Sequence, residues 1–289
     1  MFDLDPHRQL PTPRDSSTLV VVREGRGGGI EVFCVERHQK AGFLGGAVVF
    51  PGGKLEEDDL DPAWASCATP PVRPAPERGA PFAPDALTLR GLAVAACREA
   101  LEEAAILPVD GAAPAHAELL AWREEMKATP EALRARLAAR GLRLDLASLH
   151  PLARWVTPTA ESRRFDTRFF LYASRGEITG AHDDQETTAS FWASPAEVLA
   201  RNDARALVLA PPTHRTLQVL AGARDAADAL AIAARSCLDP ICPRAIAHHD
   251  DAGDTIAIAL PGDPEHEVKE ARVPGPSRYV FRGGRFVLP

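Results

Sequence analysis

Three glutamates stand close together in the run Arg98-Glu99-Ala100-Leu101-Glu102-Glu103. On a helix, steps of three and four residues place their carboxylates on one side, within reach of each other. Like charges at this spacing repel, and most short acidic runs of this kind form a solvated helix face. A hard divalent cation reverses the energetics, because Mg²⁺ or Mn²⁺ neutralises clustered carboxylate oxygens. The run therefore predicts either an exposed acidic face or a site for a divalent metal.

A second segment of interest precedes this run, where Val49-Phe50-Pro51 leads into Gly52-Gly53. A strand that enters two glycines can turn tightly and present backbone carbonyls beside the helix carboxylates. The two segments together resemble the box of the Nudix hydrolases, G-x5-E-x7-R-E-U-x-E-E-x-G-U, in which U is a bulky apolar residue. The residues that match are Gly53, Asp59 in place of the first glutamate, Arg98, Glu99, Glu102, Glu103 and Ile106.

The sequence departs from the box in three ways. A long insertion, from about Leu60 to Arg90, separates its halves, where the family norm is only seven residues between them. Ala100 is small for the first apolar position. Ala105 replaces the terminal glycine, at a point where left-handed backbone favours glycine. None of these changes removes a metal ligand.

The long insertion is similar to that of one subgroup, the coenzyme A diphosphatase-like Nudix proteins typified by the animal peroxisomal enzyme. Other stretches support this resemblance in order along the chain: 37–53 (RHQKAGFLGGAVVFPGG), 155–170 (WVTPTAESRRFDTRFF), 190–198 (SFWASPAEV) and 209–213 (LAPPT). The resemblance covers most of residues 18–220. It implies a Nudix fold of the α/β (α+β) class, a mixed β-sheet sandwiched between helices.

The resemblance also implies roles for the box residues. Glu99, Glu102 and Glu103 would bind Mg²⁺ or Mn²⁺ together with the Gly52 carbonyl, and Arg98 would orient Glu99 and Asp59 by paired hydrogen bonds. Water would then attack one phosphorus of a diphosphate. The general base would be a box glutamate or a later acid. Glu186 is the first later candidate, with Asp183 and Asp184 next to it; the alternative for Glu186 is an acidic surface turn.

The substrate contacts expected from the same motifs are Arg37, Arg163, Arg164 and Phe50. Guanidinium groups match phosphate oxygens, so the arginines could hold phosphates. Arg163 and Arg164 could equally pair with Glu161 or Asp166 for structural reasons. The pair His248-His249 beside two aspartates is interpreted as an exposed turn.

These residues imply a metal-dependent hydrolase that cuts a nucleoside diphosphate linked to another group. Coenzyme A or acyl-CoA is the first substrate expected. The alternatives are an NADH or ADP-ribose pyrophosphatase, and a non-catalytic Nudix-fold binding or regulatory protein. The three intact glutamates, Glu99, Glu102 and Glu103, argue against the last alternative.

The strands and helices that must position these residues are predicted from runs of β-branched and aromatic residues and from apolar residues at helical spacing. Strands are expected at 18–22, 30–36, 47–50, 152–157, 168–173 and 190–193, the first two as a hairpin, and short strands in the tail with turns at Gly253, Gly262 and Gly283. Helices are expected at 89–107, 115–127, 131–140, 213–220 and 225–235. Ser194-Pro195 should cap a further helix, and Thr129-Pro130 the helix at 131–140.

These elements suggest a Nudix domain over residues 1–222, with an insertion at about 60–90 and a helical insert at about 112–145. Residues 223–289 form a helix and short-strand extension packed on the same domain. Because its prolines forbid a regular helix, the stretch between Pro62 and Pro84 is expected to be a surface excursion that is dispensable for folding and shapes the substrate entrance.

Composition and charge bear on the partners and the location of the protein. A net charge of −7 over 289 residues argues against a nucleic-acid partner, which would require a basic face. No apolar run approaches the length that crosses a bilayer, and the first residues lack a signal pattern. The five scattered cysteines indicate reduced thiols, so a cytoplasmic location is expected. The sequence is compatible with a homodimer and does not decide the oligomeric state.

Overall fold

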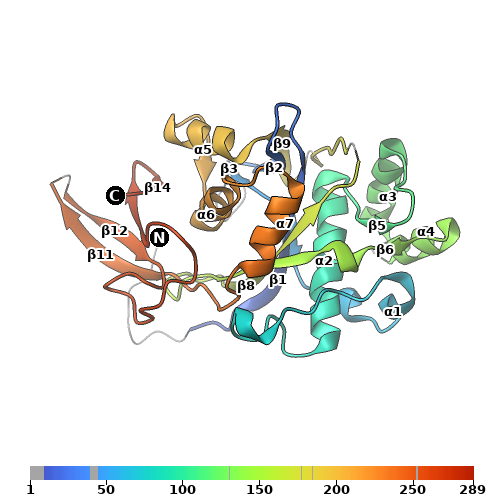
Figure 1. Cartoon of the computed structure of the whole chain (residues 1–289), viewed down its shortest axis with the longest axis horizontal. Helices are drawn as coiled ribbons and strands as arrows, with labels where there is room; N and C mark the ends of the chain where they lie inside the picture. Colours follow the sequence, from blue (N-terminus) through green and yellow to red (C-terminus); the bar gives the residue numbers. More distant parts are fainter. Residues whose placement is uncertain (1–9, 40–44, 130, 177, 184, 252) are drawn as a thin grey trace.

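The computed structural model describes residues 10–39, 45–129, 131–176, 178–183, 185–251 and 253–289. A mixed eight-stranded sheet crosses its centre (Figure 1), with the order β10-β3-β2-β1-β8-β7, β4 pairing with β1, and β9 with β2. Its central pair, β1 and β8, is parallel, and β1 and β2 form the expected hairpin. The strands are β1 (Arg14–Glu24), β2 (Ile30–Arg37), β3 (Ala47–Val49), β4 (Gly52–Lys54), β7 (His150–Val156), β8 (Phe165–Ala173), β9 (Thr187–Ala193) and β10 (Val208–Leu209).

Helices cover both faces of this sheet, because alternate residues of a strand point to opposite sides. In β1, Leu19 and Val21 pack into the apolar cluster formed with α2 (Ala86–Ala104). Val20 and Val22 pack into the cluster on the other face. That second face is covered by α5 (Pro195–Asp203), α6 (Pro211–Leu220) and α7 (Ala226–Arg235). The expected mixed sheet between helices is confirmed.

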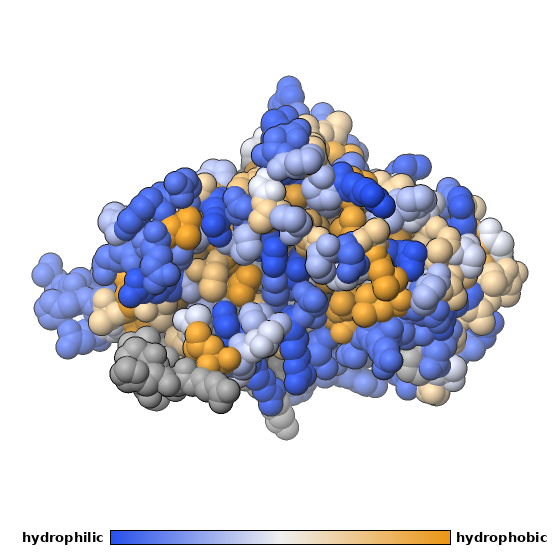
Figure 2. Space-filling view, turned by 90° about the horizontal axis from the view of Figure 1, so that it is seen from below, coloured by the Kyte–Doolittle hydropathy of each residue, from blue (hydrophilic) through white to orange (hydrophobic). Residues whose placement is uncertain are grey.

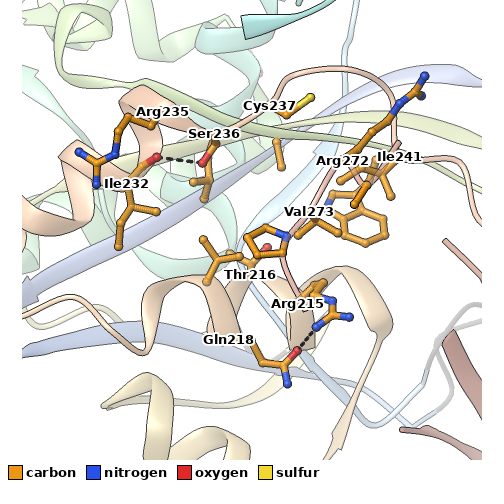
Figure 3. Close-up of a pocket in the computed structure, with 16 residues that line it drawn as sticks. Arg215, Thr216, Gln218, Ile232, Arg235, Ser236, Cys237, Ile241, Arg272 and Val273 are labelled. Carbon is orange, nitrogen blue, oxygen red and sulfur yellow. Dashed lines mark hydrogen bonds between the residues drawn. The ribbon is translucent and has the colours of Figure 1, made fainter. Parts of the chain in front are cut away.

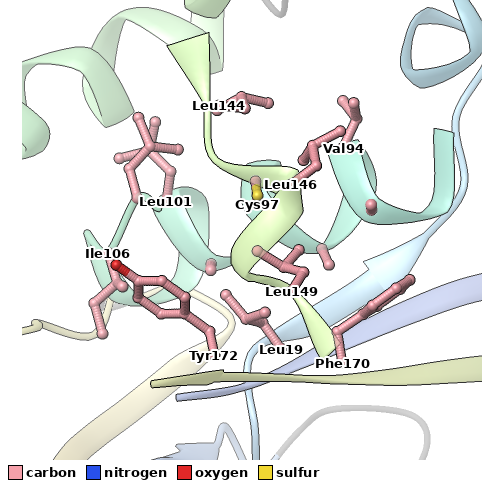
Figure 4. Close-up of a cluster of buried hydrophobic side chains, with 14 of the residues drawn as sticks. Leu19, Val94, Cys97, Leu101, Ile106, Leu144, Leu146, Leu149, Phe170 and Tyr172 are labelled. Atoms are coloured by element: carbon pink, nitrogen blue, oxygen red, sulfur yellow. The ribbon is translucent and has the colours of Figure 1, made fainter. Parts of the chain in front are cut away.

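A pair of inserted helices extends the α2 side of the molecule. The pair consists of α3 (His116–Ala128) and α4 (Ala132–Arg140). At its base, β5 (Val109–Asp110) pairs with β6 (Arg143–Leu144), and the 3-10 helix η3 (Leu146–Ser148) follows β6. Figure 4 shows how residues of this insert reach the core: Leu144 and Leu146 pack around Cys97 and Leu101 of α2. The insert is therefore anchored on the helix that carries the box acids.

The proline-rich segment is not the surface excursion expected from its sequence. It contains η1 (Asp58–Leu60), α1 (Trp64–Cys67) and η2 (Pro76–Arg78). Trp64 and Phe82 are only 2% and 3% exposed and belong to the α2 cluster. The Phe82 ring meets Phe170 edge to face, with centroids 5.4 Å apart. The expectation was wrong because aromatic side chains placed among the prolines are buried, while most of the prolines stay at the surface.

The C-terminal segment forms an antiparallel sheet of four strands at one end of the molecule (Figure 1). Ile258, Leu260 and Tyr279 of this segment join the cluster under α6 and α7. His214 Nδ1 and Tyr279 Oη lie 2.8 Å apart and link α6 to this sheet. The strands are β11 (Arg244–Asp250), β12 (Gly253–Ala259), β13 (Arg278–Arg282) and β14 (Arg285–Val287).

Most element boundaries expected from the sequence are confirmed to within four residues. Ser194 caps α5 as expected, its Oγ accepting from the Glu197 amide. The helix expected at 89–107 instead begins at Ala86, because Asp85 caps it through the Thr88 amide, and ends at Ala104. The residue at the N-terminus of α4 is Glu131, which makes no side-chain capping bond. The second half of the predicted Thr129-Pro130 cap lies outside the described residues.

Within the described ranges, no helix is both long and apolar enough to cross a bilayer. Figure 2 shows one face of the molecule, on which apolar patches are separated by polar and charged residues. All five cysteines are unpaired, as expected from their spacing.

Candidate active site

The two glycines of β4 let this strand lie directly against α2. A Cβ added at Gly53 would lie 2.2 Å from Glu99 Oε1, which is far inside contact distance. A Cβ added at Gly52 would lie 2.4 Å from the Ser17 carbonyl oxygen of β1. A side chain at position 52 would push β4 away from β1, and one at position 53 would displace the Glu99 carboxylate. The glycine pair thus brings the backbone of β4 to the box carboxylates.

The backbone groups of Gly52 face α2 and not β1. The amides of Leu19 and Leu55 donate to the carbonyls of Pro51 and Asp15. Because backbone groups alternate in direction along a strand, those of Gly52 lie on the opposite edge. The Gly52 amide indeed donates to Glu103 Oε2 at 3.0 Å. Its carbonyl lies on the same edge, where the sequence predicted a backbone ligand.

Arg98 connects the two halves of the box through all five of its N–H groups. Nε and Nη2 donate to the Asp59 carboxylate at 2.9 and 3.0 Å, and Nη2 also donates to the Lys54 carbonyl. Nη1 donates to Glu99 Oε1 at 2.9 Å and to Glu102 Oε2 at 3.1 Å. Asp59 is fully buried. The orienting bonds expected from Arg98 to Glu99 and Asp59 are therefore present despite the long insertion between the halves.

The box carboxylates carry more negative charge than their surroundings compensate. Burial, with smaller contributions from the charges of Glu99 and Glu186, raises the pKa of Glu103 to about 8, against the opposing effects of the Gly52 amide and Arg37. Burial likewise raises the pKa of Glu99 to about 7, against the effect of Arg98. The pKa of Glu102 is raised, also mainly by burial. Glu103 is 5% exposed, and among the residues that the structure describes its carboxylate accepts a hydrogen bond from the Gly52 amide alone.

This donor set fits a hard divalent cation. Glu99, Glu102, Glu103, Asp59 and Glu186 supply carboxylate oxygens, against the guanidinium groups of Arg98 and Arg37. Over the described ranges, no three acidic, histidine or cysteine side chains already surround one point. Glu99 and Glu102 turn toward Arg98 and Glu103 toward Gly52, because each carboxylate finds its nearest donor there. An added cation would supply the positive charge that this cluster lacks.

Glu186 is more than 80 residues away from the box in sequence, but its loop is bonded to the end of the box helix, where the Ala181 amide donates to the Ala104 carbonyl. Its charge raises the pKa of Glu99, Glu102 and Glu103, and its side chain is exposed. Asp183, another of the later acids, instead accepts the amides of Glu186 and Thr187 within its own loop. Asp184 lies outside the described residues. Of these later acids, Glu186 stays the predicted general base, and its side chain is exposed.

The residues that the sequence predicts to contact the substrate lie in different parts of the fold and differ in burial and bonding. Arg37, at the end of β2, acts on Glu103, and its Nε has no hydrogen-bond partner within the described ranges. Phe50 is 3% exposed and belongs to the cluster on the opposite face of the sheet. Arg164 donates to the carbonyls of Thr157 and Pro11, which favours the structural alternative for this residue.

Arg163 is exposed, as a residue that meets a phosphate should be. Of the two structural partners expected for it, Glu161 and Asp166, Asp166 is bound by Arg154, with Oδ2 and Nη2 2.7 Å apart. Its role stays a prediction.

Sequence reasoning missed Arg123 on α3. This residue is 8% exposed, and its Nη1 donates at 3.0 Å to the carbonyls of both Ala181 and His182, in the loop that leads to Glu186. Its position could have drawn attention, because Leu119, Trp122 and Met126 form the apolar stripe of α3 and Arg123 lies on it. A charged residue on a buried stripe requires a specific partner.

A cavity of about 610 Å³ lies away from the box, on the α6 and α7 side of the sheet (Figure 3). Its walls include Leu152, Trp155 and Ile232, and it also contains Arg215 and Arg272. None of the box residues lines it. The carboxylate cluster, and not this cavity, is the candidate active site.

The family model for the NUDT19 Nudix domain matches residues 22–220, which is more than half of the chain. The chain is a Nudix hydrolase. The match places it in the NUDT19 group, as the split box and the further motifs indicated. In this Nudix chain the matched region contains both halves of the box, Arg123 and Glu186.

Known proteins share this Nudix sequence over long stretches. A chicken protein named acyl-coenzyme A diphosphatase NUDT19 is 30% identical over 273 residues, covering 81% of this chain and 72% of that protein. A human protein of the same name is 28% identical over 67% of this chain and 61% of its own length. A solved NUDIX hydrolase from Alicyclobacillus acidocaldarius is 32% identical over 77% of this chain and 97% of that chain, with a TM-score of 0.63. The Nudix fold predicted from the sequence is confirmed.

Proposed function

We propose that this Nudix hydrolase cleaves the diphosphate of coenzyme A or acyl-CoA in a reaction that requires Mg²⁺ or Mn²⁺. Water adds to one phosphorus, and the bond to the bridging oxygen breaks, giving a phosphopantetheine and an adenosine bisphosphate. The observation that carries the metal requirement is the buried, undercompensated carboxylate cluster around Glu103. The similarity to acyl-coenzyme A diphosphatases over most of the chain supports the substrate class.

The residues that would hold the metal are Glu99, Glu102 and Glu103, with the Gly52 carbonyl as a backbone ligand. A bound divalent ion would neutralise the diphosphate oxygens and make the attacking water more acidic. Arg98 keeps Glu99 and Glu102 beside each other through Nη1, and its bond to Asp59 fixes the guanidinium in turn. This chain thus supplies an ordered set of carboxylates before any ion binds.

The remaining steps fall to residues at the edge of the cluster. Glu186 is exposed next to the box and would accept the proton of the attacking water as general base. Arg37 lies close to Glu103 with an unbonded Nε, so its guanidinium would contact a phosphate oxygen. In the sequence, Arg37 precedes the metal ligands and Glu186 follows them. In the fold, both residues would lie next to these ligands.

Other diphosphates are the main alternative, since NADH and ADP-ribose contain the same reacting bond. A panel of coenzyme A, acyl-CoA, dephospho-coenzyme A, NADH and ADP-ribose, incubated with Mg²⁺ or Mn²⁺, separates these substrates when products are identified by mass. We expect the highest kcat/KM on coenzyme A or acyl-CoA. A preference for NADH or ADP-ribose would overturn the substrate assignment, and inactivity on all five would favour a binding protein.

Recognition of the 3′-phosphate of coenzyme A is proposed for Arg163. Replacing it with alanine should cost about 1–3 kcal/mol of transition-state binding on coenzyme A, the range for a hydrogen bond to a charged group. The loss should be much smaller on dephospho-coenzyme A. Arg164→Ala is the matched control, because Arg164 binds backbone carbonyls, and any loss there should be equal on both substrates. Equal losses for Arg163→Ala would remove it from this role.

We further propose that residues 1–222 form the Nudix domain, that residues 223–289 are an extension packed on it, and that the protein acts in the cytoplasm. The unpaired cysteines support a reducing compartment. Light scattering on the purified protein would distinguish a monomer from the homodimer with which the sequence is compatible.

A further inference from the structure

The loop between β8 and β9 carries Glu186 to the box, and two elements hold it from outside. The Ala181 amide donates to the Ala104 carbonyl at the end of α2, at 2.7 Å. Arg123 of α3 holds the same point from the other side, since Nη1 donates to the adjacent carbonyls of Ala181 and His182. The loop is therefore tied at one place both to the box helix and to the inserted helix pair.

The contact made by Arg123 is a specific one. The arginine is almost fully buried, and its neighbours on α3, Leu119, Trp122 and Met126, belong to the α2 cluster. A guanidinium removed from water is unfavourable unless its N–H groups find acceptors, and bonds from a charged donor are the stronger ones. Two loop carbonyls accept from Nη1 at 3.0 Å, and Nε lies 3.9 Å from Glu124 Oε1 with no hydrogen-bond partner among the described residues. The packing of α3 therefore fixes the position of these carbonyls.

A short and well-bonded segment connects this anchor to Glu186. Asp183 directly follows His182, and its carboxylate accepts the amides of Gln185, Glu186 and Thr187. The Glu186 carbonyl accepts the His38 amide beyond β2 at 2.8 Å. The Glu186 backbone is thus held through its amide by Asp183 and through its carbonyl by His38, in a loop bonded to the Ala104 carbonyl beside Glu103.

We propose that Arg123 is a positioning residue that holds Glu186 at the box, and that the inserted helix pair serves to present this loop. The proposal rests on the proposed function of Glu186 as general base. Arg123 does not touch the reacting atoms; it acts through the carbonyls of Ala181 and His182. The insert thus contributes to turnover without contributing a metal ligand.

A double-mutant cycle tests this coupling in the full chain. Arg123→Ala should lower kcat by about tenfold or more with little change in KM, because a base displaced by about 1 Å loses much of its efficiency. Arg123→Lys should recover part of the loss. In a Glu186→Gln background, Arg123→Ala should add less than about threefold, since the group it positions is already absent. Multiplicative losses in the double mutant would overturn the proposal.

Arg136→Ala is the matched control, because Arg136 lies on the same helix pair and its Nε binds Glu125 and not the loop. It should leave kcat unchanged. Thermal denaturation of every variant identifies any loss that reflects stability alone, and an equal fall in kcat for Arg136→Ala would also overturn the proposal.

Hydrogen exchange gives a readout that does not depend on activity. Arg123→Ala should speed amide exchange in the described residues 178–183 and 185–187, and Arg136→Ala should not. Unchanged exchange in Arg123→Ala would overturn the positioning role even if the enzyme were inactive on every diphosphate. Inactivity of the unmodified protein, with faster exchange in Arg123→Ala, would instead count against the proposed function alone.

Discussion

At the scale of single residues, Glu103 gives the fold a pH dependence. Its pKa is about 8 in the folded chain and 4.5 in the unfolded reference, so between these values the folded state holds the extra proton. Unfolding free energy should therefore fall as pH rises through this window, by up to about 1.4 kcal/mol per pH unit for one such group. Denaturant unfolding of metal-free protein at pH 5 and pH 8 would measure this. Glu103→Gln should flatten the dependence; an unchanged slope in that variant would contradict the assignment to Glu103.

The same carboxylates should control metal binding. Glu102→Gln and Glu103→Gln each remove one charge from the shared site, so both should lower the rate by orders of magnitude with little loss of fold. The rise in melting temperature on adding Mg²⁺ or Mn²⁺ should shrink in both variants, which provides a test independent of turnover. Activity within a few-fold of the unmodified protein in both variants would exclude the cluster as the metal site.

Ala105 shows how a box position without its glycine is accommodated. It adopts φ 50° and ψ 40°, and it is fully buried. The left-handed conformation costs about 1–2 kcal/mol for a residue with a Cβ. Glycine would remove that cost, but the loss of a buried methyl group would lower stability by about 0.8 kcal/mol. The greater chain entropy of glycine in the unfolded state would lower stability by a further ~0.5–1 kcal/mol. Ala105→Gly should therefore change stability by less than about 1 kcal/mol.

Ala105→Val is the contrasting variant for the same measurement. A β-branched residue is a strong outlier at positive φ, and extra methyl groups overpack the site, so a loss above ~2 kcal/mol is expected. Chemical denaturation of both variants measures the difference. Equal effects of glycine and valine would show that backbone conformation does not limit this position.

At the scale of elements, the insertion inside the box should be part of the folding unit. Trp64→Ala and Phe82→Ala should each cost about 3–5 kcal/mol, the range for truncating a buried aromatic side chain. Leu87→Ala is a control, because Leu87 is 43% exposed. Replacing residues 61–85 with a glycine-serine linker should give an insoluble or strongly destabilised protein. A soluble product with unchanged melting temperature would restore the view that the segment is a surface excursion.

At the scale of the whole molecule, the C-terminal segment completes the core under α6 and α7. Ala229, Ala233, Ile241, Ile258 and Tyr279 all belong to that cluster, which also contains Val20 of the central strand. A chain ending at residue 222 would expose one face of the sheet, and we expect it not to fold. Removing only residues 285–289 deletes the edge strand β14 and should be milder. A folded and active 1–222 chain, judged by circular dichroism and turnover, would contradict this expectation.

The sequence alone determined the chemistry and the order of the elements. The spacing of Glu99, Glu102 and Glu103 and the pair Gly52-Gly53 carry the Nudix pattern, and local patterns located most strands and helices. These features depend on residues near each other in the chain, where periodicity and turn chemistry act directly.

Only the tertiary structure decided which distant residues meet the box and which segments are buried. Arg123 meets the loop that carries Glu186 through helix packing that no local pattern records, although Arg123 on an apolar stripe was a readable signal. Phe82 lies among prolines that indicate a surface loop, and it is buried because Phe170 of a strand nearly ninety residues later supplies its partner. Burial depends on which surfaces meet in the folded chain, and a local pattern specifies only one of the two surfaces.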